Sequence, residues 1–412
     1  MKILIVIPAL GNVYGGTSKI AIELAQALGK QNLDVDMVTT DANGTTRLNV
    51  PLHAWVKEKY YRVQYFPYGG WNDYKMSWSL TRWLFQQIKH YDVVHTIAVF
   101  SIPTLIAHWI CQLYGIPYVM NPQGMLEPWA LSYKAWKKRL YYRIIEKPVL
   151  QRASAIQMLS SAEAENIKLL NLKPPQIIIP NGLHRQDFEK LPNPEVFYQQ
   201  FPATRNKTLI LFLGRIDPKK GLDLLAKAFG QIHPNFPHTH LIIAGPDNIG
   251  FLPTAKDYFA NAGCLNTVTF TGMLTGSLKY AALAATNIYV APSYSEGFSM
   301  SVLEGMASGL PCVITTGCNF PEAAKAKVAH VVDINMDAIA SGACATQIAS
   351  SLTHYLTHPQ EAKAMGNRAR QFILENYTWD KIAANLIKVY QSIINRDSHL
   401  FLAEENQKQS CQ

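Results

Sequence analysis

Several motifs that would assign a chemistry at once are missing from this sequence. Its six cysteines are scattered, and no C-x-x-C pair or histidine cluster offers the ligand spacing of a zinc site. We therefore predict no metal site and expect free thiols in a reducing compartment. Charged residues make up 16% and hydrophobic residues 48% of the chain, as in an ordinary globular protein.

We also predict neither a membrane span nor an export signal from the sequence. Residues 96–126 contain no Asp, Glu, Lys or Arg, but prolines, a histidine and a glycine interrupt the run, so we expect a helix over 102–114 followed by a strand. The opening MKILIVIPALG has a short apolar run that stops at Pro8 and no small-residue cleavage site, which predicts a buried first strand. We expect a cytoplasmic protein without a membrane span.

A standard dinucleotide-binding fingerprint is absent as well. Gly11, Gly15 and Gly16 lie between the first strand and the first helix, but their spacing does not fit G-x-G-x-x-G. Such a turn lets backbone N–H groups and a helix N-terminus approach a phosphate, or it is a tight turn that simply needs glycine. Asp41, after the second strand, matches the ribose-binding acid of a dehydrogenase only in position, and we do not favour that function.

The order of apolar and amphipathic segments predicts two α/β domains. A chain of 412 residues is too long for a single core. Strand-like runs alternate with helix-like ones, which is typical of parallel sheets covered by helices. The alternation pauses over the polar stretch 187–207, where we place a linker, and restarts with TLILFLGR. Because ligands bind at the carboxyl ends of such strands, we expect two doubly wound, Rossmann-like domains facing each other across a cleft.

The net charge of +9 is concentrated in one segment. Residues 132–153, SYKAWKKRLYYRIIEKPVLQRA, contain seven Lys and Arg residues and one acid, Glu146, with aromatic residues interleaved. A helix of this composition suits the surface of an anionic membrane. The alternative is a scaffold helix that places Trp136, Tyr141 and Ile144 in the core.

Two strand-loop-helix segments in the second half carry candidate binding residues. In LGRIDPKKGLDLL, Arg215 ends a strand and Lys220 begins a helix, so both cations can reach one anion. In PSYSEGFSMSVLEGMASGLP, Glu296 lies at the mouth of a helix and Glu304 two turns further in. The two carboxylates can accept hydrogen bonds from two sets of hydroxyls, such as those of a sugar and a ribose joined by a diphosphate. The alternative for the two cations is that they are ordinary surface residues. The alternative for the two acids is that they only suit the helix dipole.

These segments resemble the donor site of glycosyltransferase family 4, retaining enzymes of the GT-B fold. The similarity rests on EGFSMSVLEGMASGLP with GRIDPKKG, and on GGTSKIAIELAQAL, PQGMLEPWAL, SSAEAENI, IIPNGL and YTWDKIA, which together span nearly the whole chain. It implies an N-terminal acceptor-binding domain over 1–190, with a C-terminal helix at about 377–396 packing back on it. A donor-binding domain over 205–376 would hold the nucleotide sugar.

The resemblance also implies a role for each matched side chain. Glu296 would contact the transferred sugar, and Glu304 the ribose hydroxyls. Arg215 and Lys220 would neutralise the diphosphate as it leaves.

Backbone groups would complete the donor site. Gly16 would face the diphosphate from the first domain, and Gly272 and Met273 would contact the base. The start of the helix would hold sugar and phosphate through the N–H groups of Gly297, Phe298, Ser299 and Met300.

One position departs from the family pattern. Many relatives carry histidine where this chain has Gln123, beside the anomeric centre. Glutamine can hydrogen-bond a sugar hydroxyl but cannot titrate, which excludes a general base here. Retention without a protein nucleophile suits a front-face mechanism, in which the leaving diphosphate takes the acceptor proton. We expect no metal ion and no bound cofactor, because Arg215 and Lys220 can stabilise the developing charge.

The sequence thus favours transfer of a sugar from a UDP- or GDP-sugar to a glycan or lipid-linked acceptor, in cell-surface polysaccharide or glycolipid synthesis. The alternatives are a nucleotide-sugar epimerase or phosphorylase of the same fold, and a non-catalytic sugar-nucleotide binding protein. We expect no nucleic-acid partner. The basic stretch 132–153 would place the protein at the inner face of the membrane as a peripheral protein.

Overall fold

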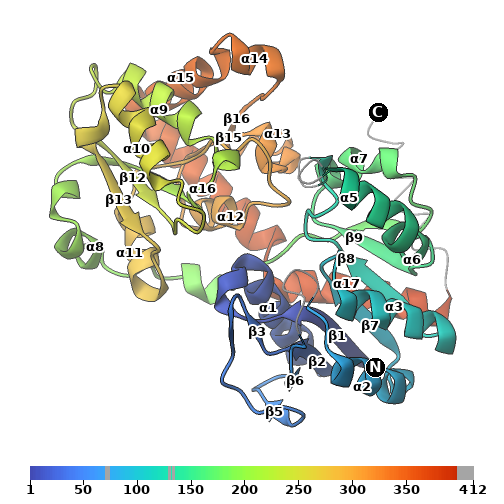
Figure 1. Ribbon diagram of the computed structural model, residues 1–412. Helices are drawn as coiled ribbons and strands as arrows, with labels where there is room; N and C mark the ends of the chain where they lie inside the picture. The colour runs from blue at the N-terminus through green and yellow to red at the C-terminus, as the bar shows by residue number, and fades with distance from the viewer. Residues whose placement is uncertain (70–74, 129–130, 132–134, 397–412) are drawn as a thin grey trace. The chain divides into compact units, whose positions relative to one another are not determined.

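The computed structural model describes residues 1–69, 75–128, 131 and 135–396 (Figure 1). The chain divides into two units: the first combines Met1–Gly182 with the chain from Trp379 onward, and the second is Leu183–Thr378. Each unit contains a largely parallel sheet covered by helices, which confirms the predicted α/β class with two doubly wound domains. Parts of two quoted motifs lie outside the described residues, Trp129 and Ala130 of PQGMLEPWAL and residues 132–134 of the basic stretch.

The second unit contains a six-stranded parallel sheet in the order β13-β12-β11-β14-β15-β16. Strands β12 and β13 lie on one side of β11, and β14, β15 and β16 lie on its other side. The carboxyl ends of β11 and β14 therefore form the topological switch point, where such sheets bind ligands. The strands are β11 Thr208–Leu213, β12 Thr239–Ala244, β13 Val268–Gly272, β14 Ile288–Ala291, β15 Cys312–Thr315 and β16 His330–Val332.

Strand β11 illustrates why this sheet is buried on both faces. Leu209 and Leu211 join one core cluster, whereas Ile210 and Phe212 join the other, because successive strand side chains point to opposite faces. The helices that supply the two clusters are α9 Leu222–Ile232, α10 Leu252–Asn261 and α15 Ala343–Thr357 on one face, and α8 Glu195–Gln200, α11 Gly276–Ala285, α12 Met300–Ala307 and α16 Pro359–Asn376 on the other.

The stretch 187–207 is not the linker that its composition predicts. Phe188 and Phe197 are buried in the core of the second unit, and α8 packs against α11. The prediction was wrong because two phenylalanines anchor this otherwise polar segment. Each one buries a large apolar side chain, and that is enough to hold a short helical turn on the domain surface.

The first unit contains an eight-stranded sheet in the order β10-β9-β8-β7-β1-β2-β6-β5, parallel except for the β5–β6 pair. Its strand order reverses between β1 and β7, which defines a second switch point. The strands are β1 Lys2–Ala9, β2 Asp34–Thr40, β5 Trp55–Lys57, β6 Arg62–Phe66, β7 Val93–Ile97, β8 Tyr118–Asn121, β9 Ala155–Met158 and β10 Gln176–Ile178.

Two sequence predictions for apolar segments are confirmed in this unit. The opening residues form β1, whose residues Ile3–Ile7 are almost completely buried. The uncharged run forms α3 (Ile102–Tyr114) followed by β8; Ser101 caps the start of α3, and Gly115, with a φ of 68°, ends it. None of the described helices has the length and apolar character needed to cross a membrane.

The C-terminal helix α17 (Trp379–Asn395) packs against α1 (Gly16–Lys30) in the first unit. Trp379 Nε1 donates a hydrogen bond to Glu23 Oε2 at 2.9 Å. Tyr390 is fully buried, and its hydroxyl lies 2.6 Å from Nδ1 of His95 in β7. One polar contact at the start of α17 and another in its second half therefore fix how its apolar face lies on the unit.

The basic stretch is helical, and the structure corrects one interpretation of it. Trp136 and Ile144 are 70% and 63% exposed, so they do not belong to the core. Tyr142 is buried there instead, and Glu146 is also buried. The elements of the stretch are α5 Ala135–Tyr141, the π-helical turn η3 Tyr142–Glu146 and α6 Lys147–Leu150.

Candidate functional site

The loop after β11 forms the first part of the site. Lys220 ends a short 3-10 helix, Pro218–Lys220, and α9 begins two residues later, so Lys220 precedes that helix rather than beginning it. Asp217 caps the 3-10 helix by accepting a hydrogen bond from the N–H of Lys219 at 3.1 Å. Gly221 has a φ of 68°, and a Cβ there would lie 2.0 Å from the carbonyl oxygen of Pro292. Only glycine therefore lets this loop pack against the loop after β14.

Lys220 and Glu296 meet as an ion pair at this switch point. Their side chains are only 11% and 9% exposed. Ser293 Oγ donates a hydrogen bond to Glu296 Oε1 at 2.9 Å, and Asn319 Nδ2 donates to the backbone carbonyl of Glu296 at 2.6 Å. Sequence reasoning missed both groups: Ser293 holds the carboxylate, and Asn319 holds the backbone of the same residue. An ion pair this desolvated depends strongly on both of its partners.

Further cations surround this ion pair. Arg215 is exposed at the carboxyl end of β11, as the sequence predicts. Burial lowers the pKa of Lys219, and the charges of Lys220 and Arg215 lower it further, against the opposing effects of Glu296 and Asp217. Three cations therefore lie near two carboxylates, and this edge of the sheet, with its excess of positive charge, suits an anionic ligand.

The start of α12 lies in the segment between the two glutamates. Ser299 occupies the N-cap position, but its side chain makes no capping hydrogen bond. The first N–H groups of a helix have no acceptor within the helix, so those around Ser299 and Met300 suit an anion or a sugar oxygen. The side chain of Phe298 instead belongs to the core, where its ring stacks on that of Tyr377.

Glu304 lies on α12 and is paired with a residue that the sequence analysis did not single out. Lys279, on α11, donates a hydrogen bond from Nζ to Glu304 Oε1 at 2.7 Å. The two side chains are 16% and 12% exposed. The sequence does contain a signal for this pair, the lone lysine in the apolar helix SLKYAALAA. A lysine that is largely buried requires an acidic partner.

Replacing Lys279 by methionine is expected to weaken nucleotide binding about fivefold. Without the ammonium group, the Glu304 carboxylate loses the hydrogen bond that holds it in place, so it is a poorer acceptor for ribose hydroxyls. Isothermal titration with UDP and GDP checks this, with Lys227→Met, an exposed lysine on α9, as the control.

The residues predicted to contact the base lie at the end of β13. Gly272 is the last residue of this strand and has a φ of 70°. Met273 follows it with 66% of its surface exposed. An exposed thioether at the carboxyl edge of the sheet is available for contact with a planar ring.

Gln123 and Gly16 belong to the first unit. Gln123 follows β8 with a φ of 52°, and its side-chain amide exchanges two hydrogen bonds of 3.2 Å with the amide of Asn181. Gly16 begins α1, and a Cβ added there would meet no atom within 4 Å. Asn181 lies in the quoted IIPNGL motif, although sequence reasoning assigned it no role.

Acids near the strands of the first unit serve the fold. Asp41 is buried and accepts hydrogen bonds from the N–H of Tyr68 at 2.7 Å and from Arg47 at 3.4 Å, which agrees with our rejection of the dehydrogenase interpretation. Asp36, in the D-x-D triplet at 34–36, is ion-paired with Arg62. Among the described residues, no three His, Cys, Asp or Glu side chains gather as they would around a metal ion.

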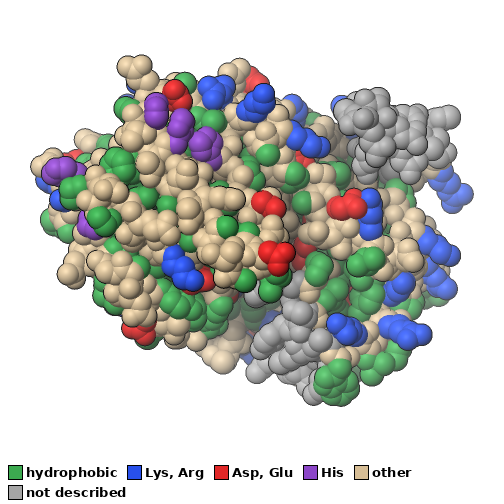
Figure 2. All heavy atoms as spheres, turned by 90° about the horizontal axis from the view of Figure 1, so that it is seen from above, with side chains coloured by type: hydrophobic (Ala, Val, Ile, Leu, Met, Phe, Trp, Pro, Cys, Tyr) green, Lys and Arg blue, Asp and Glu red, His purple; other side chains and the backbone are tan. Residues whose placement is uncertain are grey.

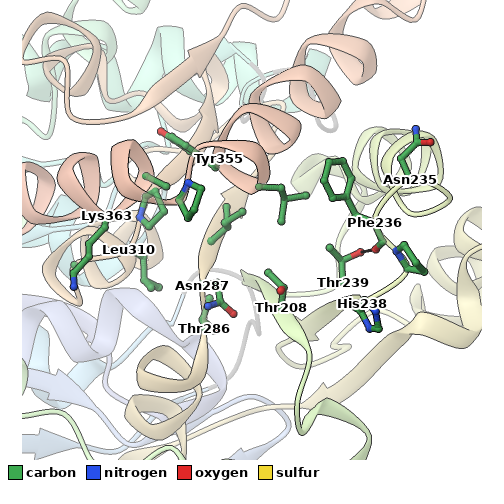
Figure 3. A pocket seen from close by; sticks show the side chains of 17 residues that line it. Thr208, Asn235, Phe236, His238, Thr239, Thr286, Asn287, Leu310, Tyr355 and Lys363 are labelled. Carbon is green, nitrogen blue, oxygen red and sulfur yellow. Dashed lines mark hydrogen bonds between the residues drawn. The ribbon is translucent and has the colours of Figure 1, made fainter.

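A cavity of about 580 Å³ lies at the opposite edge of the second unit's sheet. Figure 3 shows Thr208, Thr239 and Asn287 around it, which stand at the amino ends of β11, β12 and β14. None of the predicted site residues lines it. Because doubly wound sheets bind their ligands at the carboxyl ends of strands, we place the candidate site with the charged groups and not in this cavity.

Curated relatives of the chain are glycosyltransferases. A D-inositol 3-phosphate glycosyltransferase of Streptomyces scabiei is 23% identical over 94% of this chain and 88% of its own length. An uncharacterised glycosyltransferase of Methanocaldococcus jannaschii is 27% identical over 47% of each chain. A phosphatidyl-myo-inositol mannosyltransferase of Mycobacterium tuberculosis is 26% identical over 52% of this chain and 53% of its own. The chain thus matches about half the length of the last two.

Solved structures share the fold at low sequence identity. Sucrose-phosphate synthase from Thermosynechococcus elongatus superposes with a TM-score of 0.73 at 20% identity, over 96% of this chain and all of that one. Anabaena HepE, solved in complex with UDP-glucose, gives a TM-score of 0.73 at 16% identity, over 95% of this chain and all of that one. These similarities confirm the predicted GT-B fold.

Family models match both units of the chain. The model described as glycosyl transferases group 1 matches residues 195–372, which contain both glutamates and their lysine partners. The model described as glycosyl transferase 4-like domain matches residues 15–182, which contain Gln123 and Gly16. The chain therefore belongs to the group 1 glycosyltransferases, and its first unit carries their family 4-like domain.

Proposed function

We propose that this glycosyltransferase is a retaining enzyme that transfers a sugar from a UDP- or GDP-sugar to a glycan or lipid-linked acceptor, in cell-surface polysaccharide or glycolipid synthesis. The observation that carries the proposal is the pairing of each predicted donor-site glutamate with a largely buried lysine in the second unit. A helix start lies between the two glutamates. This order of groups matches a donor that presents sugar hydroxyls, a diphosphate and ribose hydroxyls in series.

The charges of the site suit the departure of a diphosphate. Negative charge grows on the phosphate oxygen as its bond to the anomeric carbon breaks, and Arg215, Lys219 and Lys220 provide positive charge before the reaction begins. Glu296 accepts a hydrogen bond from Ser293 and is ion-paired with Lys220, so its carboxylate is held in place as an acceptor for sugar hydroxyls. We propose that these cations make a metal ion unnecessary.

A front-face mechanism with retention suits Gln123. The acceptor oxygen forms a new bond to the anomeric carbon on the side from which the diphosphate leaves, and the acceptor proton passes to a diphosphate oxygen. The Gln123 amide cannot take that proton. Its pairing with Asn181 orients it as a hydrogen-bonding group for a sugar hydroxyl.

The names of the relatives support this choice of substrates. UDP-glucose is bound in the Anabaena HepE structure. Two of the relatives are named for inositol phosphate and phosphatidylinositol acceptors. A nucleotide-sugar donor and a phosphorylated or lipid-linked acceptor are therefore the first compounds to test.

The experiment that tests the proposal is a screen of UDP- and GDP-sugars by thermal shift, followed by an assay for release of UDP or GDP. Stabilisation by one nucleotide class and slow release of that nucleotide support a transferase, because water can replace the acceptor. An interconverted nucleotide sugar without nucleotide release indicates an epimerase, and phosphate-dependent release a phosphorylase. Binding without any turnover, with water or with glycan and lipid-linked sugars as acceptors, favours the non-catalytic alternative.

The exposed side chains of the basic stretch support docking to an anionic membrane. Leu140 and Ile144 are both more than half exposed, and Arg139 and Arg143 are exposed beside them. Figure 2 shows Lys and Arg side chains with hydrophobic ones among them at the right of the view, the side on which Figure 1 draws α5 and α6. Cations interleaved with apolar groups bind an anionic surface by charge and by burial together.

We expect the Arg139→Ser/Arg143→Ser double variant to bind anionic vesicles roughly 30-fold more weakly, since each cation near such a surface contributes about 1 kcal/mol. Sedimentation with phosphatidylcholine vesicles, with and without phosphatidylglycerol, measures this at low and high salt. The Lys207→Ser/Lys227→Ser variant removes two exposed charges from the second unit and should bind like the unmodified protein. Equal binding to neutral vesicles, or no binding at low salt, would remove the membrane from the proposal.

A further inference from the structure

Two loops at the carboxyl edge of the first unit's sheet have an unusual backbone. The loop after β7 contains Ala98 and Phe100, with φ angles of 80° and 59°, and the turn after β8 contains Gln123, with a φ of 52°. Residues other than glycine seldom adopt positive φ, and they keep it only where the surrounding structure holds them. The β7 loop lies at the switch point of this sheet, and the β8 turn carries the glutamine predicted to contact the sugar.

A buried glutamate holds the first of these loops. Glu146 is 1% exposed, and its Oε1 accepts a hydrogen bond of 2.7 Å from the N–H of Phe100. The ring of Phe100 also lies 6.0 Å from that of Tyr141. Glu146 is the single acid of the basic stretch. Its carboxylate is buried and holds a loop, so it does not balance the surface cations.

A second buried glutamate holds the other turn in the same way. Glu163 lies on α7 (Ser161–Asn166) and is fully buried. Its Oε1 accepts a hydrogen bond from the N–H of Gly124 at 2.9 Å, and its Oε2 accepts one from the N–H of Leu159 at 2.6 Å. One carboxylate therefore ties the residue after Gln123 to the end of β9.

A carboxylate is a costly group for this purpose if only stability matters. Burial raises the pKa of both Glu146 and Glu163 to about 7, although the backbone N–H groups lower it. A neutral amide could accept the single hydrogen bond made to Glu146 at a smaller desolvation cost, whereas only a carboxylate can accept a hydrogen bond at each of its two oxygens, as Glu163 does. Two carboxylates each hold a loop with strained backbone beside the predicted site. This indicates that the two loops must keep a particular conformation.

We propose that Glu146 and Glu163 are positioning residues, which hold the β7 loop and the Gln123 turn in the conformations that bind substrate. Neither glutamate touches substrate itself. This inference rests on the proposed function, because it assumes that Gln123 contacts the transferred sugar.

Hydrogen–deuterium exchange of the full chain tests the structural half. Glu163→Ala should raise exchange in the peptide over 121–126 at least tenfold, and Glu146→Ala should do so over 98–101, since each loses a charge-assisted hydrogen bond. Glu146→Gln should restore most of the protection, because the amide oxygen can accept the N–H of Phe100. Glu163→Gln should restore it only in part, because the amide oxygen can accept just one of the two N–H groups that the carboxylate holds. Glu165→Ala, an exposed neighbour on α7 paired with Lys168, should change neither peptide.

Release of UDP or GDP from the donor tests the functional half, with water as the acceptor. Each alanine variant should lose about tenfold in kcat and keep its nucleotide Kd within twofold, because most of the proposed nucleotide contacts lie in the second unit and Gly16 is on neither of the two loops. The pH dependence of kcat gives a second readout, because Glu163 has a pKa raised by burial. The nearby charge of Glu127, which accepts a hydrogen bond from Asn166 Nδ2, also raises this pKa. Since protonation removes acceptor capacity, kcat should fall between pH 8 and pH 6 in the unmodified protein, and this dependence should be weaker in Glu163→Gln.

The outcomes are separable. Unchanged exchange in the two loops, or increased exchange spread over the whole unit, would overturn the positioning role. Loosened loops with unchanged kcat would overturn their connection with substrate. If the unmodified protein turns over no donor, the proposed function fails instead, and the exchange measurements still decide whether the glutamates hold the loops.

Discussion

Alanine in place of Arg215 or Lys220 is expected to lower turnover by roughly a hundredfold or more, the loss seen when one preorganised donor to a developing charge is removed. Binding of the donor should weaken less than turnover, because charge on the diphosphate grows only as the bond to the sugar breaks. Rates of UDP or GDP release and nucleotide affinities, measured on the same preparations, separate the two effects. Arg205→Ala, which removes an exposed arginine paired with Glu195, is the control.

The two variants should differ in stability. Arg215 is exposed, so its removal should leave the unfolding temperature nearly unchanged. Loss of Lys220 leaves the buried carboxylate of Glu296 without its cation, which costs about 3–5 kcal/mol when a buried pair is broken. If Arg215→Ala and Lys220→Ala lose equal turnover although only the second is destabilised, the loss of turnover results from the missing charge and not from the loss of stability. Activity that requires added Mg²⁺ and disappears with EDTA would contradict the metal-independent mechanism.

Glu304→Gln is expected to weaken nucleotide binding by about 1–3 kcal/mol, the value of a hydrogen bond to a charged group. Free UDP or GDP should lose as much affinity as the nucleotide sugar, since the ribose belongs to both. The amide keeps the size of the side chain, and its oxygen can still face Lys279. Titration calorimetry measures the loss, and Glu361→Gln, an exposed acid on α16, serves as the matched control.

A deoxyribose nucleotide makes this test specific to the ribose. If Glu304 accepts hydrogen bonds from the ribose hydroxyls, the 2′-deoxy nucleotide should bind the unmodified protein more weakly. In Glu304→Gln the same deletion should cost much less, because the two changes remove one interaction. Unchanged affinity for UDP and GDP, or fully additive losses, would show that Glu304 has another role.

The features that the sequence predicted correctly depend on local patterns. Apolar runs such as KILIVIP and TLILFLGR mark buried parallel strands, and both form the strands that they predict. The ion pair between Lys220 and Glu296 was within reach because both follow neighbouring strands at one switch point. Residues that meet at one end of a parallel sheet can be grouped from sequence once the strand order is known.

The partners that fix those residues were harder to predict. Lys279 reaches Glu304 from another helix, and Asn319 reaches Glu296 from the loop after β15, so only the packing of elements brings them together. The assignment of 187–207 as a linker failed for the same reason, since average polarity hides two anchoring phenylalanines. The sequence groups Glu146 with the surface charges of the basic stretch. Its side chain is buried because it lies on the side of the helical turn that faces the protein interior.

The position of α17 in the first unit has a consequence for the order of synthesis. The second unit is one continuous segment, Leu183–Thr378, whereas the first unit includes both early and late parts of the chain. At the usual rate of about 5–20 residues per second, a ribosome needs roughly 10–40 s to make the intervening segment. During that time the α1 surface covered by α17 has no partner from its own chain.

Synthesis of the first unit therefore begins before that of the second unit but is completed after it, when α17 has been made. The buried side chains of α17, among them Trp379, Leu386 and Tyr390, reach their places only after the second unit has been synthesised. An apolar surface left open on a growing chain is a site for chaperone binding or for misassembly. A nascent chain stalled after Thr378 should expose this surface, and one released after Asn395 should bury it.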